Sequence, residues 1–333
     1  MKAIVYTKYG PPDVLQLKEV EKPTPNDNQV LVQVHAASVN PADRARMGLP
    51  FLVRLVLRLL KPKLVDGLLK PKNTILGADI AGRVEAVGRN VTEFQPGDEV
   101  FGVCVGGFAE YVCAAETKLA LKPANVSFEA AAAVPVAAVT ALQGLRHAGQ
   151  IRPGQKVLVN GASGGVGSFA VQLAKSFGAE VTAVCSTRNL DMARSIGANH
   201  VINYTQEDFT RNQQCYDLIF AVNGYHSLSD YKRALSPQGI YVCAGGTMPQ
   251  IFQALLLGSL MSRNGGKKMG SMGIAKVNQK DLVFLGQLLE AGKVKPVIDR
   301  RYPLSEVAEA LRYLGEGHAR GKVVITVEHN YKT

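Results

Sequence analysis

The chain has 333 residues, more than a single hydrophobic core usually organises, so two domains are expected. Its hydrophobic content of 47% and its 33 glycines are typical of a globular α/β enzyme and exclude a disordered or fibrous protein. The net charge of +11 favours anionic ligands, but no Lys/Arg block with interleaved aromatic residues is present, so nucleic-acid binding is not expected.

The apolar segments and the cysteines favour a cytoplasmic protein. The longest apolar run, FLVRLVLRLL, is interrupted by arginines and is shorter than the ~20 residues needed to span a bilayer. The N-terminal sequence MKAIVYTKYG lacks the apolar core of a signal peptide. The five cysteines are scattered without a C-x-x-C pair, which suits a reducing compartment.

The N-terminal part is predicted to form a mostly antiparallel β domain. Segments such as QVLVQVHAASVN and DIAGRVEAVG mix β-branched with polar residues, and Gly, Pro and Asn punctuate them. The segment FQPGDEVFGV places a Pro-Gly-Asp turn before a further strand. We place this domain at residues 1–126 and expect residues 279–333, which end in the strand GKVVITV, to return to it.

Residues 127–278 are predicted to form a second domain around a parallel sheet. An alanine-rich helix follows Ser127, which has the residue type of an N-cap, with Glu129 in the first turn. From Lys156 onward, strands such as KVLVN and YDLIFAV alternate with helices of about 10 residues. This alternation is typical of a doubly wound parallel sheet, so the expected fold class is α/β.

The first strand of this sheet, KVLVN, runs into the glycine turn GASGGVG, and the helix SFAVQLAKSFG follows. Because glycine has no Cβ, the backbone can turn sharply and approach a pyrophosphate, to which the new helix offers free N–H groups and its positive dipole end. The pattern is G-x-x-G-x-x-G rather than the commoner G-x-G-x-x-G. A tight turn without a ligand is the alternative interpretation. The predicted pyrophosphate-binding residues are Gly161, Ser163, Gly164, Gly165, Val166 and Gly167.

The end of the second strand favours NADPH over NADH. An NAD site places Asp or Glu there for the ribose hydroxyls, whereas this chain reads VCSTRN. Glu180 precedes that strand and therefore lies at the wrong end of the sheet. A 2′-phosphate could accept hydrogen bonds from Ser186 and a charge-assisted pair from Arg188. The alternative is that Arg188 is simply solvated at the start of a helix.

The whole chain resembles the medium-chain dehydrogenase/reductase superfamily, in particular its zinc-free quinone oxidoreductase and enone reductase branch. The motifs that carry the resemblance run in family order: HAASVNPAD, ILGADIAGRVEAVG, FQPGDEVFG, AAAVPVAAVTALQGL, the glycine turn and GKVVITV. The resemblance implies a GroES-like catalytic domain, a Rossmann domain, an active site in the cleft between them and a homodimer. The implied substrate is a small hydrophobic carbonyl compound or quinone.

By this resemblance, the metal positions of zinc-dependent relatives are occupied by residues that do not bind zinc. Cys, His and Cys of those relatives correspond to Asn40, Ala78 and Val136, and none of these supplies a thiolate or imidazole. Asp79 takes the position of the family's glutamate, and one carboxylate does not make a tight zinc site. Ala42 lies where alcohol dehydrogenases place a proton-relay hydroxyl. Metal-assisted alcohol oxidation is therefore not expected.

The resemblance also implies roles for further residues. Asn40 is expected beside the nicotinamide ribose or the substrate carbonyl, with a plain turn residue as the alternative, and Thr140 is expected to contact the nicotinamide. Asp43 is expected to hold the Asn40 loop. Arg44 stands where relatives often carry an aromatic pocket wall, so the pocket is expected to differ. The remaining residues expected to line the cofactor groove are Tyr204, Asn223, Ala244, Gly245 and Gly246.

A basic, apolar segment, LPFLVRLVLRLLKPKLVDGLLKPK, follows the NPAD motif. On a helix, Arg54, Arg58 and Lys61 would form one stripe and apolar residues would cover the rest. Three interpretations are open: a lid over the substrate cleft, core or dimer packing, and peripheral membrane contact through residues 51–63.

These observations predict a zinc-independent, NADPH-dependent oxidoreductase that transfers hydride to an activated double bond or a quinone. One alternative is a catalytically weak NADPH-binding sensor or membrane-associated adaptor of the same fold. A further alternative is an NADP-dependent alcohol dehydrogenase.

Overall fold

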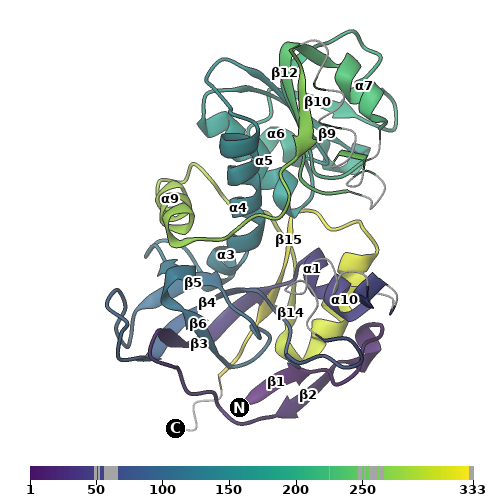
Figure 1. Cartoon of the computed structure of the whole chain (residues 1–333). Helices are drawn as coiled ribbons and strands as arrows, with labels where there is room; N and C mark the ends of the chain where they lie inside the picture. The colour runs from purple at the N-terminus through teal and green to yellow at the C-terminus, as the bar shows by residue number, and fades with distance from the viewer. Residues whose placement is uncertain are drawn as a thin grey trace. The chain divides into compact units, whose positions relative to one another are not determined.

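The computed structural model describes residues 1–48, 51, 53–55, 67–224, 226–246, 250, 253–254, 258, 262 and 266–329 (Figure 1). Two compact units share the chain. Unit 1 comprises Met1–Val136, Val277–Glu290 and Ile298–Thr333, and unit 2 comprises Ala137–Lys276 and Ala291–Val297. The fold class is α/β, as predicted.

Unit 1 is built on a seven-stranded sheet. Six of the strands follow the order β14-β15-β3-β4-β5-β7, and the remaining strand, β6, pairs with β3. Every pair is antiparallel except β14–β15, so the predicted antiparallel character is confirmed. The strand bounds are β3 (Gln29–Ser38), β4 (Asp79–Val87), β5 (Glu99–Val103), β6 (Tyr111–Ala115), β7 (Leu119–Leu121), β14 (Ile298–Pro303) and β15 (Lys322–Thr326). A separate antiparallel pair joins β1 (Lys2–Val5) to β2 (Gln16–Glu19).

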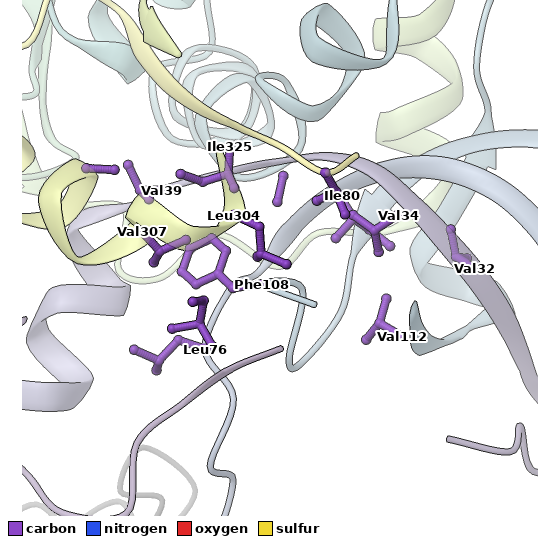
Figure 2. Packing of buried hydrophobic residues seen from close by; sticks show 14 of the residues in the cluster. Val32, Val34, Val39, Leu76, Ile80, Phe108, Val112, Leu304, Val307 and Ile325 are labelled. Atoms are coloured by element: carbon purple, nitrogen blue, oxygen red, sulfur yellow. The ribbon is translucent and has the colours of Figure 1, made fainter. Parts of the chain in front are cut away.

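The core of unit 1 forms because the strands carry valine, isoleucine and alanine at buried positions. Val32 and Val34 of β3, Ile80 of β4 and Ile325 of β15 are at most 2% exposed and belong to the same buried cluster as Phe108 (Figure 2). Burial of such side chains contributes about 1.5–3 kcal/mol each.

The helices of unit 1 cover this sheet and its ends. They are α1 (Pro41–Gly48), α3 (Phe128–Ala132), α9 (Gln279–Glu290) and α10 (Val307–Gly315), with 3-10 turns η1 (Pro12–Val14), η3 (Glu116–Lys118) and η6 (Leu304–Glu306). Ser127 caps α3 by accepting a hydrogen bond from the Ala130 N–H, as predicted.

The unit boundaries differ from the predicted domain bounds at residues 127–136, 277–278 and 291–297. Helix α3 packs on β3, β4 and β15, so the segment from 127 to 136 groups with unit 1 rather than with the parallel sheet. Residues 291–297 group with unit 2, where Gln172 and Lys295 exchange two hydrogen bonds of 2.7 and 3.0 Å. A pattern of strands and helices does not show which sheet an intervening helix contacts.

Unit 2 is an entirely parallel six-stranded sheet in the order β10-β9-β8-β11-β12-β13. Its strands are β8 (Lys156–Asn160), β9 (Glu180–Cys185), β10 (His200–Asn203), β11 (Tyr216–Ala221), β12 (Leu235–Cys243) and β13 (Lys268–Ser271). The chain moves outward from β8 to β10 and then returns to β11 on the other side of β8. Ligands of doubly wound sheets bind at this point of reversal, at the carboxyl ends of the strands.

The helices of unit 2 begin with α4 (Pro135–Gln143), in which the chain passes from one unit to the other, and a π-helical turn (Gly144–Ala148). The others are α5 (Gly165–Ser176), η5 (Thr187–Asn189), α6 (Leu190–Ser195) and α7 (Leu228–Arg233). Strands β8 and β11 are buried on both faces, which explains their near-continuous apolar sequences.

The segment with three open interpretations falls largely outside the described residues. Of residues 49–66, the structure describes 51 and 53–55, all in helical conformation, so the proposed stripe of Arg54, Arg58 and Lys61 cannot be followed along it. Within the described parts of the chain, no helix has the length and hydropathy needed to cross a membrane.

Candidate functional site

The glycine turn of unit 2 connects β8 to α5, as predicted. Gly161 has φ +84°, and a Cβ there would lie 2.8 Å from the backbone nitrogen of Asn223. A Cβ on Gly167 would lie 2.1 Å from the Gly161 carbonyl oxygen. Both glycines are therefore required by the protein's own backbone.

Gly164 differs from these two glycines because nothing in the described protein fills the space beside it. It precedes α5 with extended backbone and has no side chain to cap the helix. The nearest atom to a Cβ there would be the Gly161 carbonyl oxygen, at 3.8 Å. An uncapped helix N-terminus behind an open glycine can receive an anionic group at its backbone N–H groups.

All the residues predicted for the cofactor lie at one edge of the parallel sheet. The strand register pairs Asn160 with Val184 and Ala221, and Ala221 with Cys243, so the strands end together. The predicted residues at this edge are Gly161, Ser163, Gly164, Gly165, Val166 and Gly167 after β8, Ser186 and Arg188 after β9, Tyr204 after β10, Asn223 after β11, and Ala244, Gly245 and Gly246 after β12.

The end of β9 carries polar and basic groups but no carboxylate. Ser186 accepts a hydrogen bond of 3.1 Å from the Asn189 side chain, and Arg188 is exposed in the turn η5. Glu180 lies at the opposite end of the strand, opposite Lys156, and contacts His200 at 2.9 Å. The prediction that Glu180 lies at the wrong end of the sheet is confirmed.

The sequence did not reveal the residues that support this edge. Asn160 donates a 2.9 Å hydrogen bond to the Tyr231 hydroxyl, which donates to the Gly224 carbonyl at 3.3 Å. The Asn160 carbonyl accepts from the N–H groups of Val222 and Asn223. These bonds hold the loop after β11 beside the glycine turn. A buried Asn ending an apolar strand was the available signal.

Thr140 lies half-buried on α4, one turn before Gly144. A Cβ on Gly144 would lie 2.2 Å from the Phe220 ring of β11, so this glycine lets the following π-helical turn pack directly on the sheet.

Asn40 belongs to unit 1, where it joins a buried polar network at the end of β3. The sheet topology explains the grouping: Ser38 pairs with Asp79 on β4 and with Val324 on β15, and the antiparallel register extended by two residues brings Lys322 opposite Asn40. The side chains of Asp79 and Lys322 are 0% and 4% exposed.

Asp79 and Lys322 form the charged centre of this network. The Lys322 ammonium lies 3.1 Å from Asp79 Oδ2 and donates to Asn40 Oδ1 at 2.7 Å. Asp79 Oδ2 also accepts from Ser38 Oγ at 2.8 Å and Asn40 Nδ2 at 3.0 Å, while Oδ1 accepts from the Val136 N–H at 2.9 Å. Every oxygen of the buried carboxylate is therefore satisfied by the protein.

Asp43 holds the Asn40 loop, as predicted. Its carboxylate accepts a 2.8 Å hydrogen bond from the Asn40 N–H. Burial raises the pKa of Asp43 to about 6, an effect that the hydrogen bond from Asn40 opposes and the nearby Asp79 reinforces. Burial raises the pKa of the Cys104 thiol, and the nearby carboxylates of Asp79 and Asp43 raise it further.

The sequence motifs did not indicate Lys322 as a site residue, although the strand GKVVITV contains it. The available signal was a positive charge at the start of one strand, Lys322, and a negative charge at the start of another, Asp79. Buried charges of opposite sign are expected to pair.

Two family models match successive parts of the chain. The model of the alcohol dehydrogenase GroES-like domain matches residues 26–124, and that of the zinc-binding dehydrogenase domain matches residues 196–325. A 2-methylene-furan-3-one reductase of Solanum lycopersicum is 38% identical over 98% of this chain and 79% of its own length.

A second relative and a solved structure are also similar to this chain over nearly its whole length. A chloroplastic NADPH-dependent alkenal/one oxidoreductase of Arabidopsis thaliana is 36% identical over 98% of this chain and 79% of its own length. The structure of a quinone oxidoreductase from Coxiella burnetii matches with a TM-score of 0.83 and 31% identity over 98% of this chain and 99% of that one.

The chain belongs to the medium-chain dehydrogenase/reductase superfamily, in its quinone oxidoreductase and enone reductase branch. Its relatives are oxidoreductases, and membership implies a nicotinamide cofactor. The carboxyl edge of the parallel sheet fits that cofactor, because it combines an open glycine, an uncapped helix and donors at the end of β9.

The two kinds of glycine in this dehydrogenase/reductase turn predict separable effects. Gly164→Ala should leave the melting temperature unchanged and weaken binding of the nicotinamide nucleotide about tenfold or more, because the new methyl group enters a space that the described protein does not fill. Gly167→Ala should lower the melting temperature, because its methyl group meets the Gly161 carbonyl.

Calorimetric titration and thermal unfolding measure both effects, with Gly270→Ala as the control, since no atom lies within 4 Å of a Cβ there. Binding of the nicotinamide nucleotide by Gly164→Ala at wild-type affinity would contradict the assignment of the glycine turn as the pyrophosphate site.

The raised pKa of Asp43 predicts that Asp43→Asn changes the free energy of unfolding by an amount that depends on pH. In the unfolded chain this carboxyl ionises near pH 3.8 and in the folded protein near 6, so its contribution to stability is lost as the pH rises between them. The stability of Asp43→Asn relative to wild type should therefore increase by roughly 2 kcal/mol from pH 4.5 to pH 7.5.

Denaturant unfolding at the two pH values measures this change. Asp230→Asn is the control of opposite sign, because hydrogen bonds from Ser227 and Arg233 lower the pKa of Asp230. If the difference in unfolding free energy between wild type and Asp43→Asn did not depend on pH, a raised pKa of Asp43 in the folded protein would be excluded.

Proposed function

We propose that the protein is a zinc-independent, NADPH-dependent reductase of activated double bonds, acting on a small hydrophobic α,β-unsaturated carbonyl compound or quinone. The proposal rests on the buried Lys322–Asp79–Asn40 network. The names of the Solanum and Arabidopsis relatives, a furanone reductase and an alkenal/one oxidoreductase, support the substrate class.

The network argues against zinc by its donor chemistry. Zinc sites need three or four N, S or O ligands at about 2.0–2.3 Å. Here the carboxylate at the family's acidic position accepts four hydrogen bonds, one of them from an ammonium group. A metal ion bound to Asp79 would meet the positive charge of Lys322 in a buried environment. Among the described residues, no cluster of three His, Cys, Asp or Glu side chains could hold a metal. The same chemistry disfavours the alcohol dehydrogenase alternative.

The network also limits which ligand group Asn40 can contact. Its amide hydrogens lie toward Asp79 Oδ2 and the Ser38 carbonyl, and its oxygen accepts from Lys322 with one lone pair remaining. Of the two contacts predicted for Asn40, a ribose hydroxyl that donates to this oxygen fits better than a substrate carbonyl, which needs a donor. Asp43 fixes the loop, and Lys322 fixes which way the amide faces.

Unit 2 supplies the proposed cofactor site. Bound NADPH supplies the hydride that reduces the electron-poor carbon. The glycine turn receives the pyrophosphate at its backbone N–H groups, and Ser186 and Arg188 bind the 2′-phosphate at the end of β9. Tyr204, which is 60% exposed, lies at the end of the neighbouring strand, and Asn223 and residues 244–246 line the other side of the turn. Thr140 is proposed to contact the nicotinamide.

The homodimer, the cytoplasmic location and the membrane contact of residues 51–63 stay predictions from the sequence.

The direct test of the proposed reaction is NADPH oxidation with a panel of enones, enals and quinones, measured with and without a strong chelator. Turnover of at least one class at an unchanged rate in chelator is expected, because the reaction needs no metal. Loss of turnover on chelation would overturn zinc independence. NADPH binding without turnover of any compound would favour the sensor or adaptor alternative.

Arg188→Ala is expected to raise the dissociation constant for NADPH about tenfold or more and leave that for NADH within twofold, because only NADPH carries the 2′-phosphate. Fluorescence titration with both nucleotides measures the ratio. Arg194→Ala removes an equal charge from α6, where Arg194 pairs with Asp191, and is the matched control. An equal loss of affinity for NADPH and NADH in Arg188→Ala would contradict the assignment of Arg188 to the 2′-phosphate.

A further inference from the structure

A cavity of about 710 Å³ lies in unit 1 beside α1. Its described lining residues do not include Lys322, Asp79 or Asn40. Its volume falls within the range of small-molecule sites, about 300–1,000 Å³. The lining comes from the turn before η1, from α1, from Arg54 and from α10. The side chains that matter here are Tyr9, Pro12, Arg44, Met47, Arg54 and Leu314.

Arg54 is a buried cation in this cavity, and two of its nitrogens have no hydrogen-bonding partner among the described residues. The residue is 8% exposed, and its guanidinium stacks 3.7 Å from the centre of the Tyr9 ring. Nε and Nη1 are buried and make no hydrogen bond with any residue that the structure describes. The aromatic ring engages the face of the guanidinium, whereas its N–H groups point outward in the plane of the group. A buried, permanently charged group with unused donors calls for an anionic partner.

A second cation lines the same cavity. Arg44 is exposed on α1, and its guanidinium packs against the backbone of α10, where a Cβ on Gly315 would lie 2.8 Å from Arg44 Cζ. Neither Arg44 nor Arg54 forms an ion pair with a described residue.

The described lining residues include no carboxylate that could neutralise the two arginines. The acidic residues nearest in sequence are engaged elsewhere. Asp13 of η1 pairs with Arg312, and the carboxylate of Asp43 accepts the Asn40 N–H.

We propose that this cavity binds a small organic anion, a carboxylate or phosphate monoester carried on an apolar body. The anionic group would take the donors of Arg54 and Arg44 in the paired geometry that guanidinium groups offer. The apolar body would pack on Pro12, Met47 and Leu314, with the Tyr9 ring behind Arg54. The site does not depend on the reductase activity.

Calorimetry with 4-phenylbutyrate and its methyl ester, in the absence of nucleotide, tests the site. The wild-type protein should bind the acid at least tenfold more tightly than the ester, and Arg54→Met should abolish that preference. Arg46→Met is the matched control, because Arg46 is an exposed arginine of α1 outside the cavity lining. Equal binding of acid and ester by wild type, or an unchanged preference in Arg54→Met, would overturn the proposal. If Arg54→Met does not fold, Arg44→Met should weaken the same preference.

A second arm identifies the source of the anionic group. Turnover of 3-benzoylacrylate and its methyl ester is compared in wild type and Arg54→Met. A rise in KM for the acid alone would assign the site to an acid group of the substrate. Binding of 4-phenylbutyrate with no effect of Arg54→Met on either KM would assign it to a separate anion. Failure of the reductase proposal would remove turnover but leave the calorimetric preference in place.

Discussion

The buried ion pair between Lys322 and Asp79 is the interaction around which unit 1 is organised. It joins the first residue of β15 to the first residue of β4, at the end of β3, so it fixes three strands that lie far apart in the sequence. Removing one partner of such a pair typically costs about 3–5 kcal/mol, because the other charge stays buried. The pair therefore constrains the sheet and the orientation of the Asn40 amide together.

A buried pair of this kind also sets the chemistry available to the site. The ammonium group supplies the positive charge beside the acidic position, and the surrounding donors come from Ser38, Asn40 and the Val136 backbone. We propose that this buried network, with its carboxylate oxygens satisfied by the protein, takes the place of a metal centre in unit 1. In this proposal the hydride comes from a nicotinamide cofactor at the carboxyl edge of the sheet of unit 2, where the glycine turn and the uncapped N-terminus of α5 offer backbone N–H groups.

Much of this arrangement could be predicted from the sequence. The alternation of strands and helices indicates the parallel sheet, and the glycine turn together with the strand ends indicates which residues meet at its edge, because parallel strands end on one side. Gly161 and Gly167 follow from the tight turn. Ser127 and Asp43 act as their residue types and spacing suggest.

The features that the sequence did not indicate depend on long-range register or on side-chain packing. Lys322 meets Asn40 only because β15 pairs with β3 across 282 positions of the chain. Asn160 and Tyr231 support the cofactor edge through contacts between β8 and α7 that no local pattern encodes. Helix α3 groups with unit 1 rather than with the parallel sheet because it packs on β3, β4 and β15, and an alanine-rich sequence does not indicate which sheet its helix contacts. The stacking of Arg54 on Tyr9 joins segments whose proximity no periodicity indicates.

The measurement that tests the central claim most directly is the metal content of the protein after expression in zinc-supplemented medium, for wild type, Lys322→Met and Asp79→Asn. If the ammonium group of Lys322 replaces a metal ion, wild type contains no stoichiometric zinc while remaining folded and able to bind NADPH. Stoichiometric zinc in wild type that is lost on Asp79→Asn would contradict the account, because it would show that Asp79 is a metal ligand rather than the partner of Lys322.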